Sequence, residues 1–262
     1  MTESCRDDKK TMEKGNIQIR LNHFLALAGV CSRRTADDHI AAGKVTVNGK
    51  IVTKLGTKID GIKDTVTFNN KKITVSEPTV VYALNKPNGV TSTSKDKNAA
   101  KTIVQLVPKS PRVFSVGRLD RESEGLILLT NDGELANKLM HPSTHVDKVY
   151  KVICILPRDF NRNVIERKLN IVRKGVIIDG VKTQPCKITV IQFIGIKMIE
   201  LEVTLNEGRK RQIRRSLGKI DLEVQVLRRI QIGGLTLGEL HIPTGKWVQL
   251  TDDQIKKLYN QQ

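Results

Sequence analysis

A hydrophobic run that follows a charged turn constrains the fold of this chain more than any other feature. Residues 126–130 read Leu-Ile-Leu-Leu-Thr, and they lie between Gly125 and an Asn-Asp-Gly turn. A short apolar run with turn residues at both ends is typical of a buried strand. The turn before it carries Gly-Arg-Leu-Asp, which ends at Asp120. Asp120 is therefore either an ordinary loop aspartate or a reactive carboxylate held at the rim of a core.

The remainder of the second half of the chain predicts more strands than helices. Strands are expected at residues 80–84, 113–116, 147–153 and 198–205, and also at 176–178 and 181–190 around a turn at Asp179-Gly180. Short helices are expected at residues 133–140 and after the Thr251 capping box. The strand–helix–strand rhythm of a doubly wound parallel sheet does not repeat. The sequence therefore predicts an α+β domain with a mixed, mostly antiparallel sheet and flanking helices.

The first part of the chain predicts a smaller module of two helices and a hairpin. Apolar residues spaced three and four apart indicate a helix from residue 20, which Gly29 can end. Ser32 suits the N-cap of a second helix, and Asn48-Gly49 is a strong hairpin signal. We predict a disordered tail at 1–17, this module at 18–76, a linker at 77–80 and the larger domain at 81–262.

The charge of the chain indicates its class of partner. The formal net charge is +18, from 45 Lys and Arg against 27 Asp and Glu, which predicts a nucleic acid partner. A composition that is basic for solubility is the plain alternative. An anionic membrane surface is disfavoured because no apolar run is long enough to span a bilayer. Four widely spaced cysteines and a polar N-terminus predict a cytoplasmic protein without a zinc site.

Several short motifs between residues 20 and 50 occur in a consistent order. They are Arg20-Leu21-Asn22, Ala28-Gly29, Ser32-Arg33-Arg34, Gly43-Lys44-Val45 and Val47-Asn48-Gly49-Lys50. This segment resembles the S4 RNA-binding domain. Arg33 and Arg34 open a helix, where cations are disfavoured by the helix dipole, and a bound phosphate would resolve that conflict. Lys44 and Lys50 extend the basic face, and a merely solvated charged face is the alternative.

Three motifs in the larger domain occur in the order found in one enzyme family. They are the Gly-Arg-Leu-Asp motif at Asp120, Lys148-Val149-Tyr150, and the run Arg209-Lys210-Arg211-Gln212-Ile213-Arg214-Arg215. Together they resemble the rRNA pseudouridine synthases that carry an N-terminal S4 domain. The resemblance implies that Asp120 is the catalytic nucleophile, that Tyr150 lies against the target uracil, and that Arg214 is the cation that pairs with Asp120.

The chemistry that the resemblance implies suits these residue types. Uridine is isomerised without oxidation and without a departing group, so no cofactor or metal is expected. A carboxylate acts on the sugar or base. An arginine can pair with both carboxylate oxygens, and an aromatic ring can stack on a flipped base. Arg118 and Lys148 are further RNA-contact candidates. The other cations of the basic run are assigned to phosphates, and these are Arg209, Lys210, Arg211 and Arg215.

The sequence therefore predicts a monomeric, cytoplasmic synthase acting on rRNA, with large-subunit rRNA favoured over small-subunit rRNA. A non-catalytic RNA-binding protein of ribosome assembly is the main rival, since every basic residue would serve it equally well. Only Asp120, Tyr150 and Arg214 separate the two hypotheses. A nucleotide N-glycosidase is a third reading, and it would need a second carboxylate to protonate the leaving group.

Overall fold

The computed structural model describes residues 18–75, 78–93, 101–158 and 161–259. The predicted tail at 1–17 and part of the predicted linker lie outside the described residues. The chain divides into two compact units, Met1–Pro78 and Thr79–Gln262. Each unit is described by itself. No helix in the described part of the chain combines the length and apolarity needed to cross a membrane.

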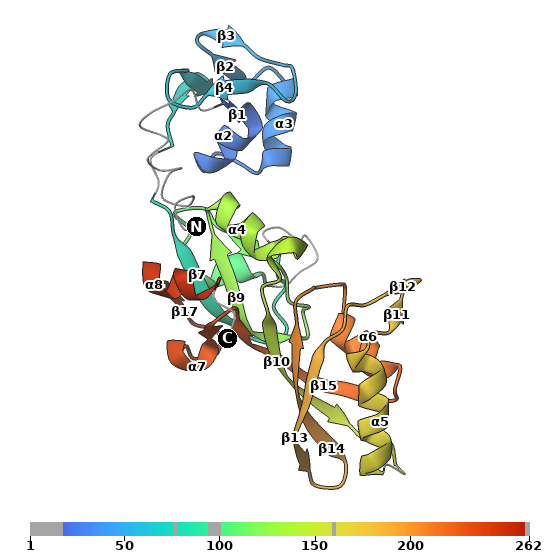
Figure 1. The fold of residues 1–262 in the computed structure, drawn as a ribbon. Helices are drawn as coiled ribbons and strands as arrows, with labels where there is room; N and C mark the ends of the chain where they lie inside the picture. The colour runs from blue at the N-terminus through green and yellow to red at the C-terminus, as the bar shows by residue number, and fades with distance from the viewer. Residues whose placement is uncertain (1–17, 76–77, 94–100, 159–160, 260–262) are drawn as a thin grey trace. The chain divides into compact units, whose positions relative to one another are not determined.

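The small unit contains two helices and three short antiparallel pairings besides the predicted hairpin. Its elements are β1 (Gln18–Arg20), α2 (Leu21–Leu27), α3 (Arg33–Ala41), β2 (Val45–Val47), β3 (Lys50–Ile51), β4 (Lys58–Asp60), β5 (Val66–Phe68) and β6 (Lys71–Ile73). One sheet has the order β3-β2-β5-β6, and β1 pairs with β4 (Figure 1). The core is formed by Leu21, Phe24, Leu25, Ala36, Ile40, Val45, Ile59 and Val66.

Local signals in the small unit are confirmed at the atomic level. The Ser32 hydroxyl accepts a hydrogen bond from the amide of Thr35 at 3.1 Å, so Ser32 is the N-cap of α3. Asn48 and Gly49 have φ values of 51° and 80°, which is the left-handed geometry that a two-residue hairpin turn requires. The turn pairs Val47 with Lys50, as the sequence predicted.

The large unit is built on one nine-stranded, mostly antiparallel sheet. The main path has the order β13-β14-β10-β15-β9-β7-β17, with β8 beside β9 and β16 beside β15. These strands are β7 (Val81–Lys86), β8 (Phe114–Val116), β9 (Glu124–Thr130), β10 (Lys148–Ile155), β13 (Lys187–Ile194), β14 (Met198–Leu205), β15 (Glu223–Ile232), β16 (Leu235–Thr236) and β17 (Trp247–Gln249). The predicted α+β class is confirmed. The contact between β9 and β15 is parallel.

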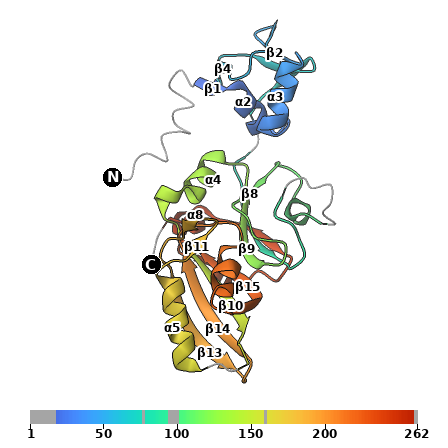
Figure 2. The same ribbon diagram turned by 90° about the vertical axis from the view of Figure 1, so that its right-hand side faces the viewer.

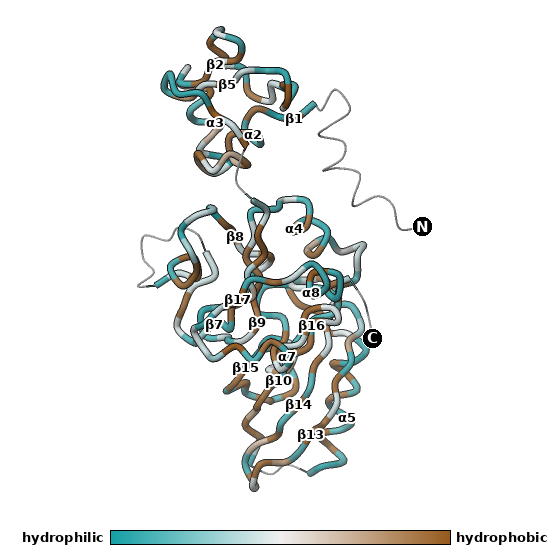
Figure 3. The backbone as a smooth tube through the Cα atoms, turned by 90° about the vertical axis from the view of Figure 1, so that its left-hand side faces the viewer, coloured by the Kyte–Doolittle hydropathy of each residue, from teal (hydrophilic) through white to brown (hydrophobic). Residues whose placement is uncertain are grey.

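Helices cover both faces of this sheet (Figures 1 and 2). The helical elements are η1 (Ile103–Leu106), α4 (Gly133–Met140), η2 (Pro142–Thr144), α5 (Arg162–Arg173), α6 (Gln212–Gly218), α7 (Leu237–Leu240) and α8 (Asp252–Lys257). The apolar sides of α5 and α6 pack with Tyr150 in one core, and α4 and α7 pack in a second core with Leu126 and Leu128. The central strand β9 is one of the hydrophobic segments of the sheet (Figure 3).

Three elements differ from the sequence prediction. Helix α5 and the long strand β15 were not predicted, although α5 has a regular apolar stripe of Ile165, Leu169 and Val172. The strands expected at residues 176–178 and 181–190 around a turn at Asp179-Gly180 form as the short hairpin of β11 (Ile177–Ile178) and β12 (Val181–Lys182), but the second strand is interrupted and resumes as β13 only at Lys187. Residues 183–186, which include Pro185, form no regular element between β12 and β13, and proline lacks the amide donor that a continuous ladder needs.

Candidate active site

Asp120 lies in the loop that joins β8 to the central strand β9. The preceding Leu119 is buried, and its backbone is held from both sides by Ser92. The Ser92 hydroxyl accepts from the Leu119 amide at 3.1 Å and donates to its carbonyl at 2.7 Å. The Asp120 carboxylate is half-buried, and in the described part of the chain no side-chain hydrogen bond or ion pair engages it. The loop thus presents a carboxylate without a protein partner.

Three consecutive backbone carbonyls fix the loop that follows Asp120. The carbonyl of Arg121 accepts from the Gly89 amide at 2.9 Å and from the Lys86 ammonium at 3.3 Å. The carbonyl of Glu122 accepts from Arg214 at 3.2 Å, and that of Ser123 accepts from Lys86. Residues from two distant segments therefore determine where Asp120 lies.

Lys86 is an unusual anchor because its side chain is fully buried, with 0% exposed. Its ammonium donates to the carbonyls of Pro87, Arg121 and Ser123. Burial lowers the pKa of Lys86 to about 8, although the nearby Glu124 and Asp120 carboxylates raise it. Sequence analysis did not select Lys86. A lysine at the end of a strand of buried residues was the available signal, since lysine is seldom fully buried.

The lowered pKa of Lys86 gives a testable pH dependence of stability. The folded chain releases the Lys86 proton near pH 8, whereas the unfolded chain keeps it until about pH 10.5. The unfolded state binds more protons in this window, so Lys86 makes stability rise with pH. Relative to Lys86→Met, we expect the wild-type free energy of unfolding to gain up to about 3 kcal/mol between pH 8 and pH 10.5. Urea denaturation of both proteins at pH 7 to 10 measures this, and a constant difference would contradict it.

Arg214 reaches the Asp120 loop from helix α6. Its guanidinium donates to the carbonyl of Val224 at 2.8 Å and to that of Glu122 at 3.2 Å, while its Nε is buried without a partner. The predicted ion pair between Arg214 and Asp120 is not formed in this structure. Arg214 instead holds the backbone two residues beyond Asp120, because its planar fork donates in two directions at once.

Tyr150 lies on β10 and belongs to the core that faces α6. Only 8% of the residue is exposed. Its hydroxyl has no hydrogen-bond partner among the described residues, but it is not sealed from solvent. The guanidinium carbon of Arg229 lies 6.0 Å from the centre of the Tyr150 ring, within the range of a cation–π contact. Sequence analysis missed Arg229, since nothing in its local pattern indicates burial.

Lys148 precedes Tyr150 by two residues on the same strand. It is half-buried, and its ammonium donates to the carbonyl of Val146 at 2.9 Å. Burial, and then the charge of Arg229, lower the pKa of Lys148 to about 8. Arg229 therefore acts electrostatically on both Lys86 and Lys148. Arg118, the other RNA-contact candidate near Asp120, is exposed.

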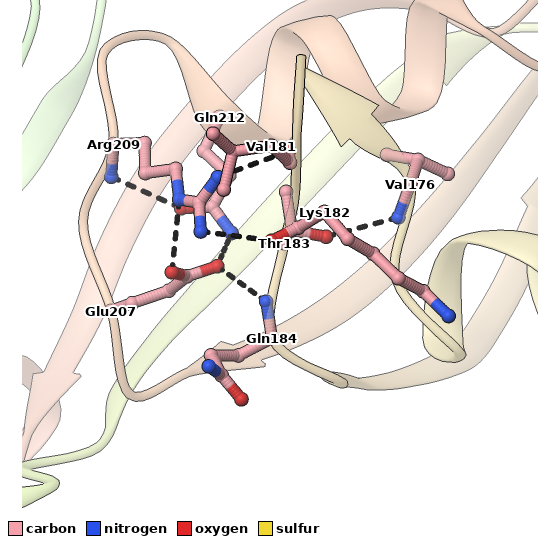
Figure 4. Close-up of polar contacts among 8 residues, drawn as sticks. All are labelled: Val176, Val181, Lys182, Thr183, Gln184, Glu207, Arg209 and Gln212. Carbon is pink, nitrogen blue, oxygen red and sulfur yellow. Dashed lines mark hydrogen bonds and ion pairs between the residues drawn. The ribbon is translucent and has the colours of Figure 1, made fainter. Parts of the chain in front are cut away.

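Arg209 from the basic run contacts the protein rather than open solvent (Figure 4). Its guanidinium donates to the carbonyls of Val181 at 3.1 Å and Lys182 at 2.9 Å. Its Nε pairs with the carboxylate of Glu207 at 3.1 Å. Gln212 completes the network, accepting from the Arg209 amide at 3.0 Å and donating to Glu207 at 2.6 Å. These bonds tie the β11–β12 hairpin to the start of α6, and they do not support a phosphate contact for Arg209.

Two other cations of the basic run also contact the protein, and a third is exposed. Arg211 pairs with Glu122 at 2.9 Å, and Arg215 forms a two-pronged contact with Asp179. Both pairs are largely exposed, so they position the loops more than they stabilise the fold. Arg211 also has a φ of 52°, a left-handed conformation that costs a non-glycine residue energy. Lys210 is exposed and stays the phosphate candidate of this run.

The basic residues predicted in the small unit are all exposed. Arg33 and Arg34 begin α3, Lys44 precedes β2, and Lys50 opens β3. Arg33 and Arg34 stand in the first turn of α3, where the helix dipole favours an anion, and the Thr35 amide of that turn is already bonded to Ser32. Among the described residues, no three His, Cys, Asp or Glu side chains gather as ligands for a metal ion.

Comparison with known proteins shows which family this chain belongs to. The family model described as RNA pseudouridylate synthase matches residues 80–219, and the S4 domain model matches residues 19–66. The chain is 40% identical over 243 residues to ribosomal large subunit pseudouridine synthase B of Bacillus subtilis (strain 168), covering 91% of this chain and 95% of that protein. It is 37% identical over 244 residues to the dual-specificity RNA pseudouridine synthase RluF of Escherichia coli (strain K12), covering 92% and 78%.

Comparison of the fold with solved structures indicates the same family. A solved structure of a pseudouridylate synthase matches with a TM-score of 0.62 and 28% sequence identity, and the match covers 92% of this chain and 99% of that chain. The matched regions include both units and all three predicted motifs. Since the family model covers more than half of the chain and the relatives align over nearly all of it, this chain belongs to the RNA pseudouridine synthases, a family of isomerases, with an N-terminal S4 domain.

Proposed function

We propose that this protein isomerises a uridine of large-subunit rRNA to pseudouridine, with Asp120 as the nucleophile. The observation that carries the proposal is the Asp120 carboxylate, which has no partner in the described residues although its loop is held by Ser92, Lys86 and Arg214. A rigid loop with an unpaired acid is suited to attack on a bound group. The S4 unit and the net charge of +18 supply the RNA affinity.

The reaction proposed for the site balances without a cofactor. The bond between sugar C1′ and uracil N1 breaks, and a bond between C1′ and uracil C5 replaces it. C5 loses a proton and N1 gains one, so the product is an isomer of the substrate. Asp120 acts on the sugar or on the base while the uracil turns, and the Tyr150 ring lies against the flipped base. Stacking of this kind stabilises a base by roughly 1–3 kcal/mol, which offsets much of the cost of flipping.

The choice of large-subunit rRNA rests on the relatives. The Bacillus subtilis relative is named for the large ribosomal subunit, and it aligns with 91% of this chain. A cytoplasmic location and a monomeric state belong to the same proposal, and sedimentation of the purified protein tests the second. A non-catalytic assembly protein would not need an unpaired Asp120 beside buried cations.

Mapping of pseudouridines in rRNA tests the function directly. We expect purified protein to convert one or a few uridines of unmodified large-subunit rRNA, and cells that lack the protein to lose the same pseudouridines. Conversion restricted to small-subunit rRNA would correct the substrate. Release of free uracil would identify an N-glycosidase instead. Binding of rRNA without any conversion would support the alternative hypothesis of a non-catalytic ribosome-assembly protein.

The salt dependence of RNA binding separates phosphate contacts from internal ones. Lys210→Ala should weaken binding and reduce the slope of log K against log salt by about 1, since one phosphate contact is lost. Arg209→Ala removes a residue of similar charge that contacts the protein, so the slope should stay close to that of the wild type. Filter binding or fluorescence anisotropy at 50 to 300 mM salt measures both slopes. A shallower slope for Arg209→Ala alone would reverse the two assignments.

A further inference from the structure

Arg229 is a buried charge that the reaction described above does not use. It lies on β15 with 2% of its surface exposed. Its Nε donates to the carbonyl of Leu126 at 2.7 Å, and its Nη2 is buried without a hydrogen-bond partner among the described residues. Charged side chains are rarely buried unless every donor is satisfied, so such a group calls for an explanation.

The strand pairings place Arg229 in one row with three other residues. Lys86 on β7 is opposite Gly125 on β9, Gly125 is opposite Arg229 on β15, and Arg229 is opposite Tyr150 on β10. Residues directly opposite one another on neighbouring strands project from the same face of a sheet. The face that carries Tyr150 therefore also carries two buried cations, and Asp120 precedes the row by five residues on the loop leading to β9.

Gly125 allows β9 to lie close enough to β15 to complete this row. A Cβ atom at this position would lie 2.2 Å from the carbonyl oxygen of Arg229 and 2.8 Å from its amide nitrogen. Only glycine permits β9 to approach β15 this closely, and its φ of 99° is also outside the range of other residues. The close approach is what brings the Arg229 backbone, and with it the guanidinium, next to the end of the Asp120 loop.

Stability does not explain a cation at this position. Arg229 lowers the pKa of both Lys86 and Lys148, so it repels two neighbouring ammonium groups. Replacement of a buried charge by an apolar side chain of similar size is often neutral or stabilising. Besides its hydrogen bond to the Leu126 carbonyl, the guanidinium contacts the Tyr150 ring, whose hydroxyl is not among the buried atoms without a partner.

We propose that Arg229 is a positioning residue that holds the Tyr150 ring in place for the flipped uridine. The inference rests on the function proposed above. The guanidinium lies against the phenol ring from inside the protein and fixes its orientation by a cation–π contact, while the hydroxyl stays on the accessible side. Arg229 does not touch the substrate, and it acts on catalysis only through Tyr150.

Three variants test this role with a fixed rRNA substrate at saturating enzyme. Arg229→Met should lower the single-turnover rate by about 10- to 30-fold, which corresponds to loss of a desolvated cation–π contact. RNA affinity should stay within about twofold, and Tm should change little, because removal of a repelled buried charge offsets loss of the hydrogen bond to the Leu126 carbonyl. Arg229→Lys should recover part of the rate. Arg228→Met is the matched control, since its side chain lies on the other face of β15, and it should keep the wild-type rate.

A double-mutant cycle with Tyr150→Leu shows whether Arg229 acts through the ring. Once the ring is absent, Arg229→Met should change the remaining rate by less than about twofold. An equal loss in both backgrounds would overturn the proposal, as would a Tm that falls together with the rate in both Arg229 variants. If the wild type forms pseudouridine and Arg229→Met is equally active, only this inference is refuted. A wild type that forms no pseudouridine in any rRNA refutes the proposed function and the inference with it.

Discussion

Asp120→Asn should abolish pseudouridine formation while leaving RNA binding nearly intact. Asparagine has almost the same shape as aspartate, so the loop held by Ser92, Lys86 and Arg214 should keep its conformation. An amide is a poor nucleophile. In enzymes that depend on a nucleophile, its removal lowers the reaction rate by at least about 10³-fold. The affinity for RNA should stay within a few-fold, because no phosphate contact is lost. Quantification of pseudouridine after hours of single-turnover reaction measures the remaining rate.

The control for this variant is a carboxylate that changes the net charge equally but lies elsewhere. Asp252 is exposed in the first turn of α8, and Asp252→Asn should keep both activity and affinity. If Asp120→Asn still forms pseudouridine at a rate near that of the wild type, the nucleophile is another group. If it loses affinity and activity in parallel, Asp120 acts in folding or binding rather than in the chemical step.

Arg214→Met should give the second-largest loss, of about 10²-fold in the single-turnover rate. The side chain joins Val224 on β15 to the carbonyl of Glu122, and its removal leaves that carbonyl with only the longer hydrogen bond from the Asn88 side chain, at 3.3 Å. A displacement of about 1 Å at a reacting group is enough for such a loss. Arg214→Lys should not restore the rate, because an ammonium lacks the planar fork that reaches two acceptors.

Measurement at saturating enzyme separates this role from the phosphate contact considered for Arg214. We expect the maximal single-turnover rate to fall and the RNA affinity to change by only a few-fold. A variant that binds RNA weakly but reacts at the wild-type rate once saturated would place Arg214 among the phosphate contacts. Thermal melting of the variant shows whether either result comes from loss of the fold. The substitution also removes the buried, unpartnered Nε of Arg214.

The two Arg214 interpretations show where sequence reasoning reached its limit. The resemblance to the synthase family identified Asp120, Tyr150 and Arg214, and the structure brings all three segments to one face of the sheet. It does not pair Arg214 with Asp120, and instead gives the guanidinium a backbone acceptor two residues away. Motif order indicates which segments meet, but the acceptor of each donor depends on angles and distances that a motif does not contain.

Local structure was the part that the sequence determined by itself. The Ser32 cap, the Asn48-Gly49 turn and the Thr251 capping box form as predicted, because each depends on hydrogen bonds between residues at most three apart. The strand at residues 126–130 was predictable for a related reason, since an apolar run between turn residues must be buried. The apolar stripe of α5 is an equally local signal.

Only the tertiary structure decided which side chains share the site. Lys86 follows a run of apolar residues, but no short-range pattern indicates that Lys86 and Arg229 lie in one row of the sheet. They meet at Gly125 because the strand order places β9 between β7 and β15, and Tyr150 joins them because β10 lies beside β15. The order of strands is set by the packing of both cores together, and this long-range free energy cannot be read from any single segment.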